Sequence, residues 1–221
     1  MIFSNEMLGL IGLGLLETLY MTVISTFMSY LLGLPVGLLL VVTDKDGIKP
    51  NATVNRVVGG IVNILRSVPF LILLVTVMPI TRAIVGTTIG STATIVPLVI
   101  GAAPFVARMV ENSAKEVDRG VIEASLSMGA STLEIVWKVI LPEAKPSLIM
   151  GAAISATTIL GYSAMSGFVG GGGLGTIAIN YGYYRKQTDI MLVMVVILIL
   201  IVAVFQEIGS LISRKCDKRI R

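Results

Sequence analysis

Long stretches of this sequence carry almost no charged side chains. Residues 7–42 contain a single one, Glu17, and four later stretches have a similar character. A transmembrane helix needs about 20 consecutive apolar residues, and inside a bilayer an α-helix pairs all of its own backbone polar groups. The sequence therefore predicts an all-α membrane protein with five transmembrane helices.

The predicted spans are separated by polar segments or by proline and glycine. They cover residues 16–42, 57–78, 92–107, 148–169 and 190–208, and an interfacial helix over residues 3–15 precedes the first. Pro35 is expected to kink the first span, while Pro146 suits the first turn of the fourth. After the fourth span, the glycine run at residues 170–175 should break the helix. At this length we expect one domain over residues 1–221, with a core at about 16–210.

Composition agrees with a membrane protein and excludes several other classes. Hydrophobic residues make up 55% of the chain and charged residues 14%, against about 25% charged residues in soluble domains. The chain has no His, and Cys216 is its only Cys, which excludes a disulfide within the chain and a His/Cys metal site. No fold motif or basic and aromatic cluster for nucleic acid is present. None of the first 44 residues is Lys or Arg, so we expect no cleaved signal peptide.

Lysine and arginine are distributed unequally between the two sets of loops. The segments at 44–56, 108–145 and 211–221 carry 3, 5 and 5 of them, whereas the N-terminus, the Arg82 loop and the loop at 170–189 carry 0, 1 and 2. Cytoplasmic loops carry an excess of positive charge. The asymmetry of 13 to 3 therefore predicts an N-terminus outside and a C-terminus in the cytosol. The segment at 111–145 and the basic tail at 211–221 then lie in the cytosol as well.

The segment at 111–145 contains two predicted short helices within an otherwise apolar chain. The first covers residues 121–128 and is opened by Asp118. It ends at Gly129, because glycine tolerates the left-handed conformation that closes many helices.

The second short helix begins with a capping box. Ser131 and Glu134 are spaced so that each side chain accepts a hydrogen bond from the other residue's backbone N–H. Glu134 and Lys138 are expected to pair at i,i+4, and Pro142 is expected to end the helix. Such a helix–Gly–helix unit at a membrane surface is either an ordinary loop with helical turns or a segment on which a partner protein acts.

This segment resembles the signature E-A-A-x-x-x-G-x9-I-x-L-P of the membrane subunits of ATP-binding-cassette importers. Five positions match it in spacing: Glu123, Ala124, Gly129, Leu141 and Pro142. Ser125 stands where Ala is usual, and Val139 where Ile is usual. The resemblance implies that residues 111–145 form a coupling loop between the third and fourth spans, through which an ATPase acts on the chain.

Three residues inside the predicted spans are candidates for a substrate path or gate. Arg66 lies about nine residues into the second span. There a charge either faces the bundle interior, as a gate or helix pin, or snorkels to the cytosolic interface. Tyr162 and Met165 share one helical face, and methionine sulfur is polarizable enough to suit a thioether substrate. The small and hydroxylic residues around them are also typical of close helix packing.

The resemblance extends over about residues 17–202 to the methionine-uptake permeases. It is carried by NILRSVPF at 63–70, VPLVIGAAPFVAR at 96–108, GYSAM at 161–165 and YGYY at 181–184. It implies a type I importer fold in a bacterial cytoplasmic membrane, in which two copies of the chain form one path at their dimer axis. It further implies two cytosolic ATPase subunits that bind ATP and Mg²⁺, and a lipid-anchored extracytoplasmic methionine-binding protein. The implied substrate is methionine, both D and L.

Other functions are left open by the sequence. The glycine run lacks the Lys and Ser/Thr of a P-loop, and nothing resembles a nucleophile with its base, so we expect no enzyme activity or cofactor on this chain. A permease for another small amino acid or a related compound would share these features. An ion-coupled secondary transporter needs intramembrane ionisable residues or a duplicated half, and the sequence shows neither an internal repeat nor a carboxylate pair at membrane depth. A scaffold without transport activity would not need Arg66 or spans broken by proline and glycine.

Overall fold

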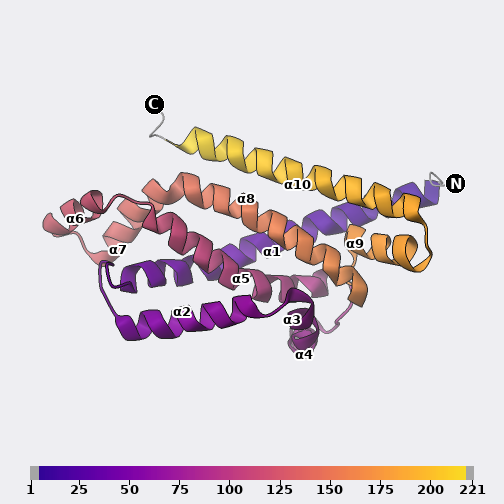
Figure 1. Ribbon diagram of the computed structural model, residues 1–221, viewed down its shortest axis with the longest axis horizontal. Coiled ribbons are helices and arrows are strands. Elements are labelled where there is room, and N and C mark those ends of the chain that lie inside the picture. The colour runs from indigo at the N-terminus through magenta and orange to yellow at the C-terminus, as the bar shows by residue number, and fades with distance from the viewer. Residues whose placement is uncertain (1–4, 218–221) are drawn as a thin grey trace.

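The long helices of the chain lie side by side and alternate in direction (Figure 1). The structure is a computed structural model that describes residues 5–217. Its long helices are α1 (Asn5–Thr43), α2 (Ala52–Ser67), α5 (Ser91–Lys115), α8 (Leu141–Met165) and α10 (Thr188–Cys216). Four helical runs of the described residues are long and apolar enough to cross a membrane, or five if α2 and α3 (Phe70–Thr76) form one bent span. The predicted all-α fold with five spans is confirmed in this form.

The first helix is longer than predicted and unbroken. α1 runs for 39 residues through the predicted boundary at residue 15, so the separate interfacial helix is wrong over its described part. Residues 3 and 4 of that prediction lie outside the described residues. Residues 5–34 contain no proline, so nothing removes a backbone donor where the break was predicted. Pro35 lies inside the helix without ending it.

α1 packs closely through small residues spaced four apart along one face. The buried members of two such runs are Gly14, Thr18, Thr22, and then Ser25, Ser29, Gly33 and Gly37. A Cβ added at Gly33 would lie 2.9 Å from the Ala103 carbonyl oxygen of α5, and one added at Gly37 would lie 2.5 Å from the Ala107 carbonyl oxygen. Small residues of this kind let two helix backbones approach each other in a membrane. For the fourth span, the sequence leaves such packing open as an alternative to a substrate path.

The second span is broken rather than continuous. The axes of α2 and α3 differ by 100°. Pro69 causes the break, because proline has no N–H to donate and forces the residue before it, Val68, into an extended conformation. A further short helix, α4 (Met78–Val85), follows α3. The prediction of one helix over residues 57–78 is therefore wrong beyond residue 67.

The fourth span begins earlier than predicted, because the helix continues through both Pro142 and Pro146. α7 (Thr132–Ile135) continues through a π-helical turn (Val136–Ile140) directly into α8. The π turn shifts the backbone hydrogen bonds by one residue just before Pro142, which has no N–H to donate. Pro146 lies inside α8 rather than at its start. The predictions that Pro142 ends a helix and that Pro146 begins the span are wrong.

The third and fifth spans also extend beyond their predicted ends. α5 continues past residue 107 to Lys115, although Pro97 and Pro104 lie within it. α10 continues past residue 208 to Cys216, through the first part of the basic tail. Residues 218–221 of that tail lie outside the described residues.

The glycine run ends the fourth span, as predicted, and is held against α1. The elements there are the 3-10 turn Ser166–Val169, α9 (Gly173–Ile177) and the π-helical segment Ala178–Tyr184. Glu17 accepts a hydrogen bond from the Gly173 N–H at 2.6 Å, and the Thr18 hydroxyl accepts one from the Leu174 N–H at 2.9 Å. These two side chains of α1 therefore satisfy backbone donors that the break leaves without helical partners.

Substitution of Gly37 should distinguish close packing from helix propensity. Gly37→Ala places a methyl group within 2.5 Å of a carbonyl oxygen of α5, and overpacking of this kind costs about 1–3 kcal/mol. Gly12→Ala, on the same helix with nothing within 4 Å of the added Cβ, should stabilise the helix by about 0.5–1 kcal/mol. Thermal unfolding of the purified protein should therefore shift Tm in opposite directions. Equal shifts would contradict the close contact of α1 with α5.

Candidate functional site

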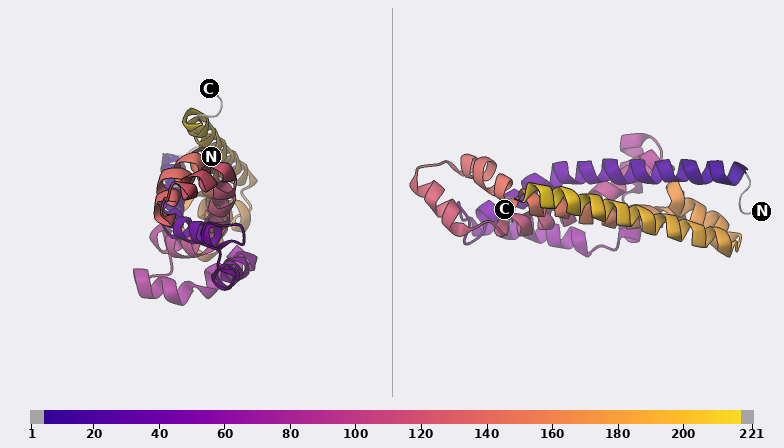
Figure 2. Two further views of the ribbon diagram at one scale, coloured as in Figure 1. Left: turned by 90° about the vertical axis from the view of Figure 1, so that its left-hand side faces the viewer. Right: turned by 90° about the horizontal axis from the view of Figure 1, so that it is seen from above.

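A helix–turn–helix segment projects from one end of the bundle (Figures 1 and 2). This projecting segment consists of α6 (Arg119–Ser127), the turn at residues 128–131, and α7. Asp118 begins α6 by accepting a hydrogen bond from the Gly120 N–H at 2.7 Å. Gly129 turns the chain with a φ of +82°, a conformation in which a β-carbon is strained. The predicted helix, its opening residue and its glycine terminus are confirmed, with boundaries shifted by one or two residues.

The capping box of α7 has the predicted geometry. Ser131 Oγ accepts a hydrogen bond from the Glu134 N–H at 3.4 Å, and Glu134 Oε2 accepts one from the Ser131 N–H at 3.1 Å. Lys138 Nζ donates to Glu134 Oε1 at 3.0 Å. Because half or more of each side chain in this ion pair is exposed, the pair adds little stability. The start of α7 is therefore fixed mainly by its cap.

The projecting segment has a buried root and an open apolar surface. Ile135 and the π turn that follows pack against Val41 and Ala114, near the ends of α1 and α5. The segment and the π turn also expose large apolar side chains: Val121, Leu126, Met128, Leu133 and Trp137. Met128 is 81% exposed and Trp137 is 64% exposed. Exposed apolar side chains gathered on so short a segment are typical of a surface that contacts another protein or a membrane.

The five residues that match the importer signature fall into two groups. Glu123 and Ala124 are exposed on α6, and Gly129 forms the exposed turn. Leu141 and Pro142 lie beyond the π turn, at the start of α8, where Leu141 packs against the buried root. The first group is accessible to a partner, and the second joins the projecting segment to a membrane helix.

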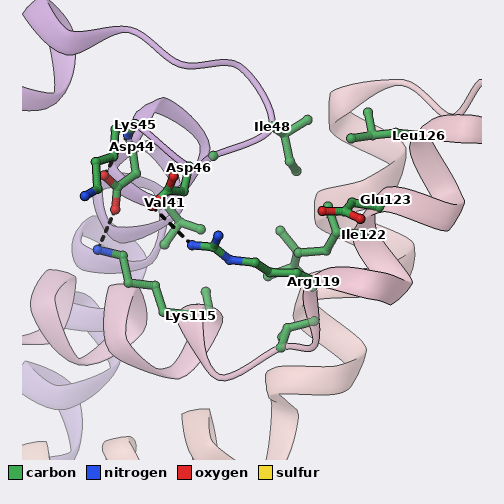
Figure 3. A pocket seen from close by; sticks show the side chains of 14 residues that line it. Val41, Asp44, Lys45, Asp46, Ile48, Lys115, Arg119, Ile122, Glu123 and Leu126 are labelled. Atoms are coloured by element: carbon green, nitrogen blue, oxygen red, sulfur yellow. Dashed lines mark hydrogen bonds and ion pairs between the residues drawn. The ribbon is translucent and has the colours of Figure 1, made fainter.

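A hollow of about 620 Å³ separates α6 from the loop that follows α1 (Figure 3). Two ion pairs join its walls: Lys115 Nζ lies 2.7 Å from Asp44 Oδ2, and Arg119 Nη2 lies 3.3 Å from Asp46 Oδ2. The Lys115 ammonium group holds the pKa of the Asp44 carboxyl below its usual range. Glu123 borders the hollow from α6 (Figure 3). The Lys115–Asp44 pair therefore connects the loop after α1 to the end of α5. The Arg119–Asp46 pair is 70% and 49% exposed and adds little stability.

A smaller pocket lies at the break between α2 and α3. Its volume is about 130 Å³, and Arg66 and Tyr162 line it together with side chains from α2, α3 and α5. Tyr162 stacks on Phe70, with ring centroids 4.4 Å apart and planes inclined by 5°. Arg66 belongs to the last turn of α2 and is exposed in the single chain. The structure thus brings Arg66 and Tyr162 to one pocket, whereas Met165 is exposed and does not line it.

Sequence reasoning missed a buried charge cluster on α5. Glu111 is only 6% exposed, and its two carboxylate oxygens accept hydrogen bonds from Arg108 and Lys115. The signal was available, because these three residues are spaced to share one helical face. The predicted third span ends at residue 107, so the prediction places all three residues in a polar loop. In a loop, helical spacing does not indicate that side chains share a face.

Among residues 5–217, no three His, Cys, Asp or Glu side chains are grouped so as to hold a metal ion.

Comparison with known sequences agrees with this arrangement. Residues 29–221 match the model of a family described as binding-protein-dependent transport system inner membrane component. The probable D-methionine transport system permease protein MetI of Vibrio cholerae is 50% identical over 203 residues, which cover 92% of this chain and 90% of that protein. The D-methionine transport system permease protein MetI of Escherichia coli K12 is 55% identical over 164 residues, which cover 74% of this chain and 76% of that protein.

Solved structures share the arrangement of the helices. A chain of the MetNI methionine ABC transporter, described as inward facing, superposes with a TM-score of 0.96 at 50% identity, covering 98% of this chain and 100% of that one. A chain of an amino acid ABC transporter with histidines superposes with a TM-score of 0.78 over 95% of both chains. Its identity of 21% shows likeness of fold alone.

Proposed function

The chain belongs to the family of binding-protein-dependent transport system inner membrane components, and we propose that it is the permease subunit of an ATP-binding-cassette importer for methionine. Its substrate is methionine in both the D and L forms. Two kinds of likeness support this choice of substrate. The Vibrio and Escherichia relatives are named for D-methionine, and the MetNI chain, which is 50% identical, comes from a methionine transporter.

The observation that carries the proposal is the projecting segment itself. It combines the importer signature with an open apolar surface and a root buried against α1 and α5. α7 continues through the π turn into α8, and only residues 116–118 separate α5 from α6. A force applied to α6 and α7 is therefore transmitted to two membrane helices without a flexible linker.

The energy for import comes from partner subunits. Two cytosolic ATPase subunits bind ATP and Mg²⁺, and each docks on the projecting segment of one permease copy. Closure of the ATPase pair moves the two segments as rigid levers and switches the permease between outward-open and inward-open states. The absence of a P-loop from the sequence supports this division of labour.

The substrate path lies between two copies of the chain. Met165 and Phe168, near the end of α8, are 47% and 52% exposed in the single chain. An open apolar surface at this position supports a contact with a second copy or with the path. The pocket of Arg66 and Tyr162 lies beside the same helix, and we assign it to the gate of the path. Arg66 positions the end of α2 there, and Tyr162 and Met165 contact the apolar substrate side chain.

The protein lies in the bacterial cytoplasmic membrane with its N-terminus outside and its C-terminus in the cytosol. The excess of Lys and Arg in the loops at the end with the projecting segment supports this orientation. A lipid-anchored methionine-binding protein delivers substrate at the opposite end, where α9 lies. α10 is covered by lipid, which its many exposed apolar side chains support.

Substitution of Gly129 tests the proposed coupling directly. A Cβ at residue 129 meets nothing within 4 Å, so only the left-handed backbone conformation restricts the residue. Gly129→Val should destabilise the turn by about 1–2 kcal/mol. The equilibrium constant of any step that requires this turn conformation should then fall about 5- to 30-fold. Gly129→Asn should be tolerated, because Asn adopts this conformation more readily than Val.

Co-purification of the ATPase and ATP-driven methionine uptake measure the Gly129 effect. We expect Gly129→Val to lose methionine uptake and to retain less ATPase while the permease still inserts, and Glu123→Ala to show a milder defect of the same kind. Wild-type ATPase retention and uptake in Gly129→Val would contradict a coupling role for the projecting segment.

Replacement of Arg66 should separate a gate from a snorkelling side chain. Arg66→Ala should lower methionine uptake severalfold while the complex with the ATPase stays intact, because the residue acts in the path. Arg56→Ala, an exposed arginine on the same helix, serves as the control and should leave uptake unchanged. Wild-type uptake in Arg66→Ala as well as in Arg56→Ala would contradict a role in the gate and would favour a side chain that snorkels to the interface.

Site-directed labelling tests the orientation. In a Cys216→Ser background, Ser131→Cys and Thr188→Cys introduce single thiols at exposed positions near opposite ends of the bundle. A membrane-impermeant maleimide should label residue 131 only from the cytosolic side and residue 188 only from outside. Labelling of both from one side would contradict five spans.

A further inference from the structure

Arg108 of α5 joins three groups on two helices. Its Nη2 donates hydrogen bonds to the Gly59 carbonyl oxygen at 3.1 Å and to Asn63 Oδ1 at 2.8 Å, both on α2. Its Nη1 contacts Glu111 Oε2 at 2.5 Å on its own helix. A guanidinium group presents its donors in a planar fork, so one side chain can hold partners in two directions at once.

The contacts continue from Glu111 to α1. Lys115 Nζ donates to Glu111 Oε1 at 2.8 Å and lies 2.7 Å from Asp44 Oδ2, in the residue that follows α1. The chain of contacts therefore runs from α2 through α5 to the end of α1. α5 lies at its centre and contributes three of its charged residues.

The cluster differs from ordinary surface ion pairs. The Glu111 side chain is 8% exposed and that of Arg108 is 23% exposed. Partly buried hydrogen bonds between charged groups are shorter and stronger than neutral ones. Removal of one partner also leaves the other charge buried without compensation. The buried centre of the cluster is Glu111. Its links outward, through the 46% exposed Lys115 to Asp44 and through Arg108 to the exposed Asn63, join α5 to α1 and to α2.

The cluster lies between the two candidate functional regions. Lys115 ends α5, and α6 begins after residues 116–118. Asn63 lies one helical turn before Arg66, at the end of α2 that borders the pocket with Tyr162. The contact of Arg108 with Asn63 thus connects the helix that leads to the projecting segment with the helix that leads to the pocket.

We infer that Arg108 is a positioning residue that transmits movement of the projecting segment to α2, and so to the pocket of Arg66 and Tyr162. The inference rests on the proposed function and deepens it. When the ATPase moves α6, α5 moves with it, and the fork of Arg108 moves α2 as part of the same rigid body. Without the fork, α5 moves while α2 lags behind, and ATP is hydrolysed without a matching movement of the gate.

The experiment uses three asparagine variants in the full complex of permease, ATPase and binding protein, reconstituted in liposomes. Asn63→Leu removes the acceptor for Arg108 at similar volume, and Asn63→Asp keeps an acceptor oxygen there. Asn55→Leu is the matched control. Asn55 is on the same helix and donates to the Leu40 carbonyl oxygen of α1 at 2.8 Å, so its loss weakens a helix contact without affecting the fork.

The decisive quantity is the number of ATP molecules hydrolysed per methionine imported. A purely structural role lowers both rates together and leaves this ratio unchanged. Transmission through Arg108 predicts that Asn63→Leu raises the ratio by about tenfold, the change in an equilibrium constant that one hydrogen bond to a charged group can produce. Asn63→Asp and Asn55→Leu should keep the wild-type ratio.

A second variant addresses the arginine itself. Arg108→Lys keeps the charge beside Glu111 but cannot hold Gly59 and Asn63 with one planar fork, so it should raise the ratio as Asn63→Leu does. Adding Asn63→Leu to Arg108→Lys should then cause no further rise, because Arg108→Lys already breaks the contact that Asn63→Leu removes. An unchanged ratio in Asn63→Leu, or a ratio raised equally in Asn55→Leu, would overturn the inference. Failure of the wild-type complex to import methionine would instead overturn the proposed function.

Discussion

The structure depends on one constraint: backbone polar groups within its apolar helices must find partners inside the protein. At Pro142 the π-helical turn meets this requirement, because it shifts the hydrogen bonds around the missing donor. At the glycine run, Glu17 and Thr18 of α1 accept from the freed N–H groups of Gly173 and Leu174. At Pro69 the helix turns by 100° instead, and the pocket of Arg66 and Tyr162 lies at that bend. At these three breaks, the lost hydrogen bonds are thus either compensated or lie at the candidate site.

Close packing of α1 on α5 provides the frame for the rest. Glycines of α1 bring its backbone against the carbonyl oxygens of α5, and the same pair of helices holds the root of the projecting segment through Val41 and Ala114. The ion pair of Asp44 with Lys115 adds a second connection at this end. A force on the projecting segment therefore acts on a rigid unit, and the contacts of Arg108 extend that unit to α2.

Much of this architecture could be predicted from the sequence, because it depends on local patterns. Apolar stretches mark the spans, and the spacing of Ser131 and Glu134 specifies the cap. Gly129 marks a turn that requires a left-handed residue. The errors arise where local patterns are ambiguous. Apolar composition alone cannot place a break within α1, and Pro69 and Pro142 look alike in sequence although one ends a helix and the other does not. The contact of Arg108 with Gly59 and Asn63 joins residues more than 40 positions apart, so only the fold reveals it.

We propose that this chain imports methionine with energy from an ATPase that acts on the projecting segment. The most direct measurement is uptake of labelled methionine by liposomes that contain the permease, its ATPase and the binding protein, with ATP enclosed and no ion gradient. We expect uptake that requires ATP and stops when the ATPase is omitted. Uptake driven by a proton or sodium gradient without ATP, or none with all three components and ATP present, would contradict it.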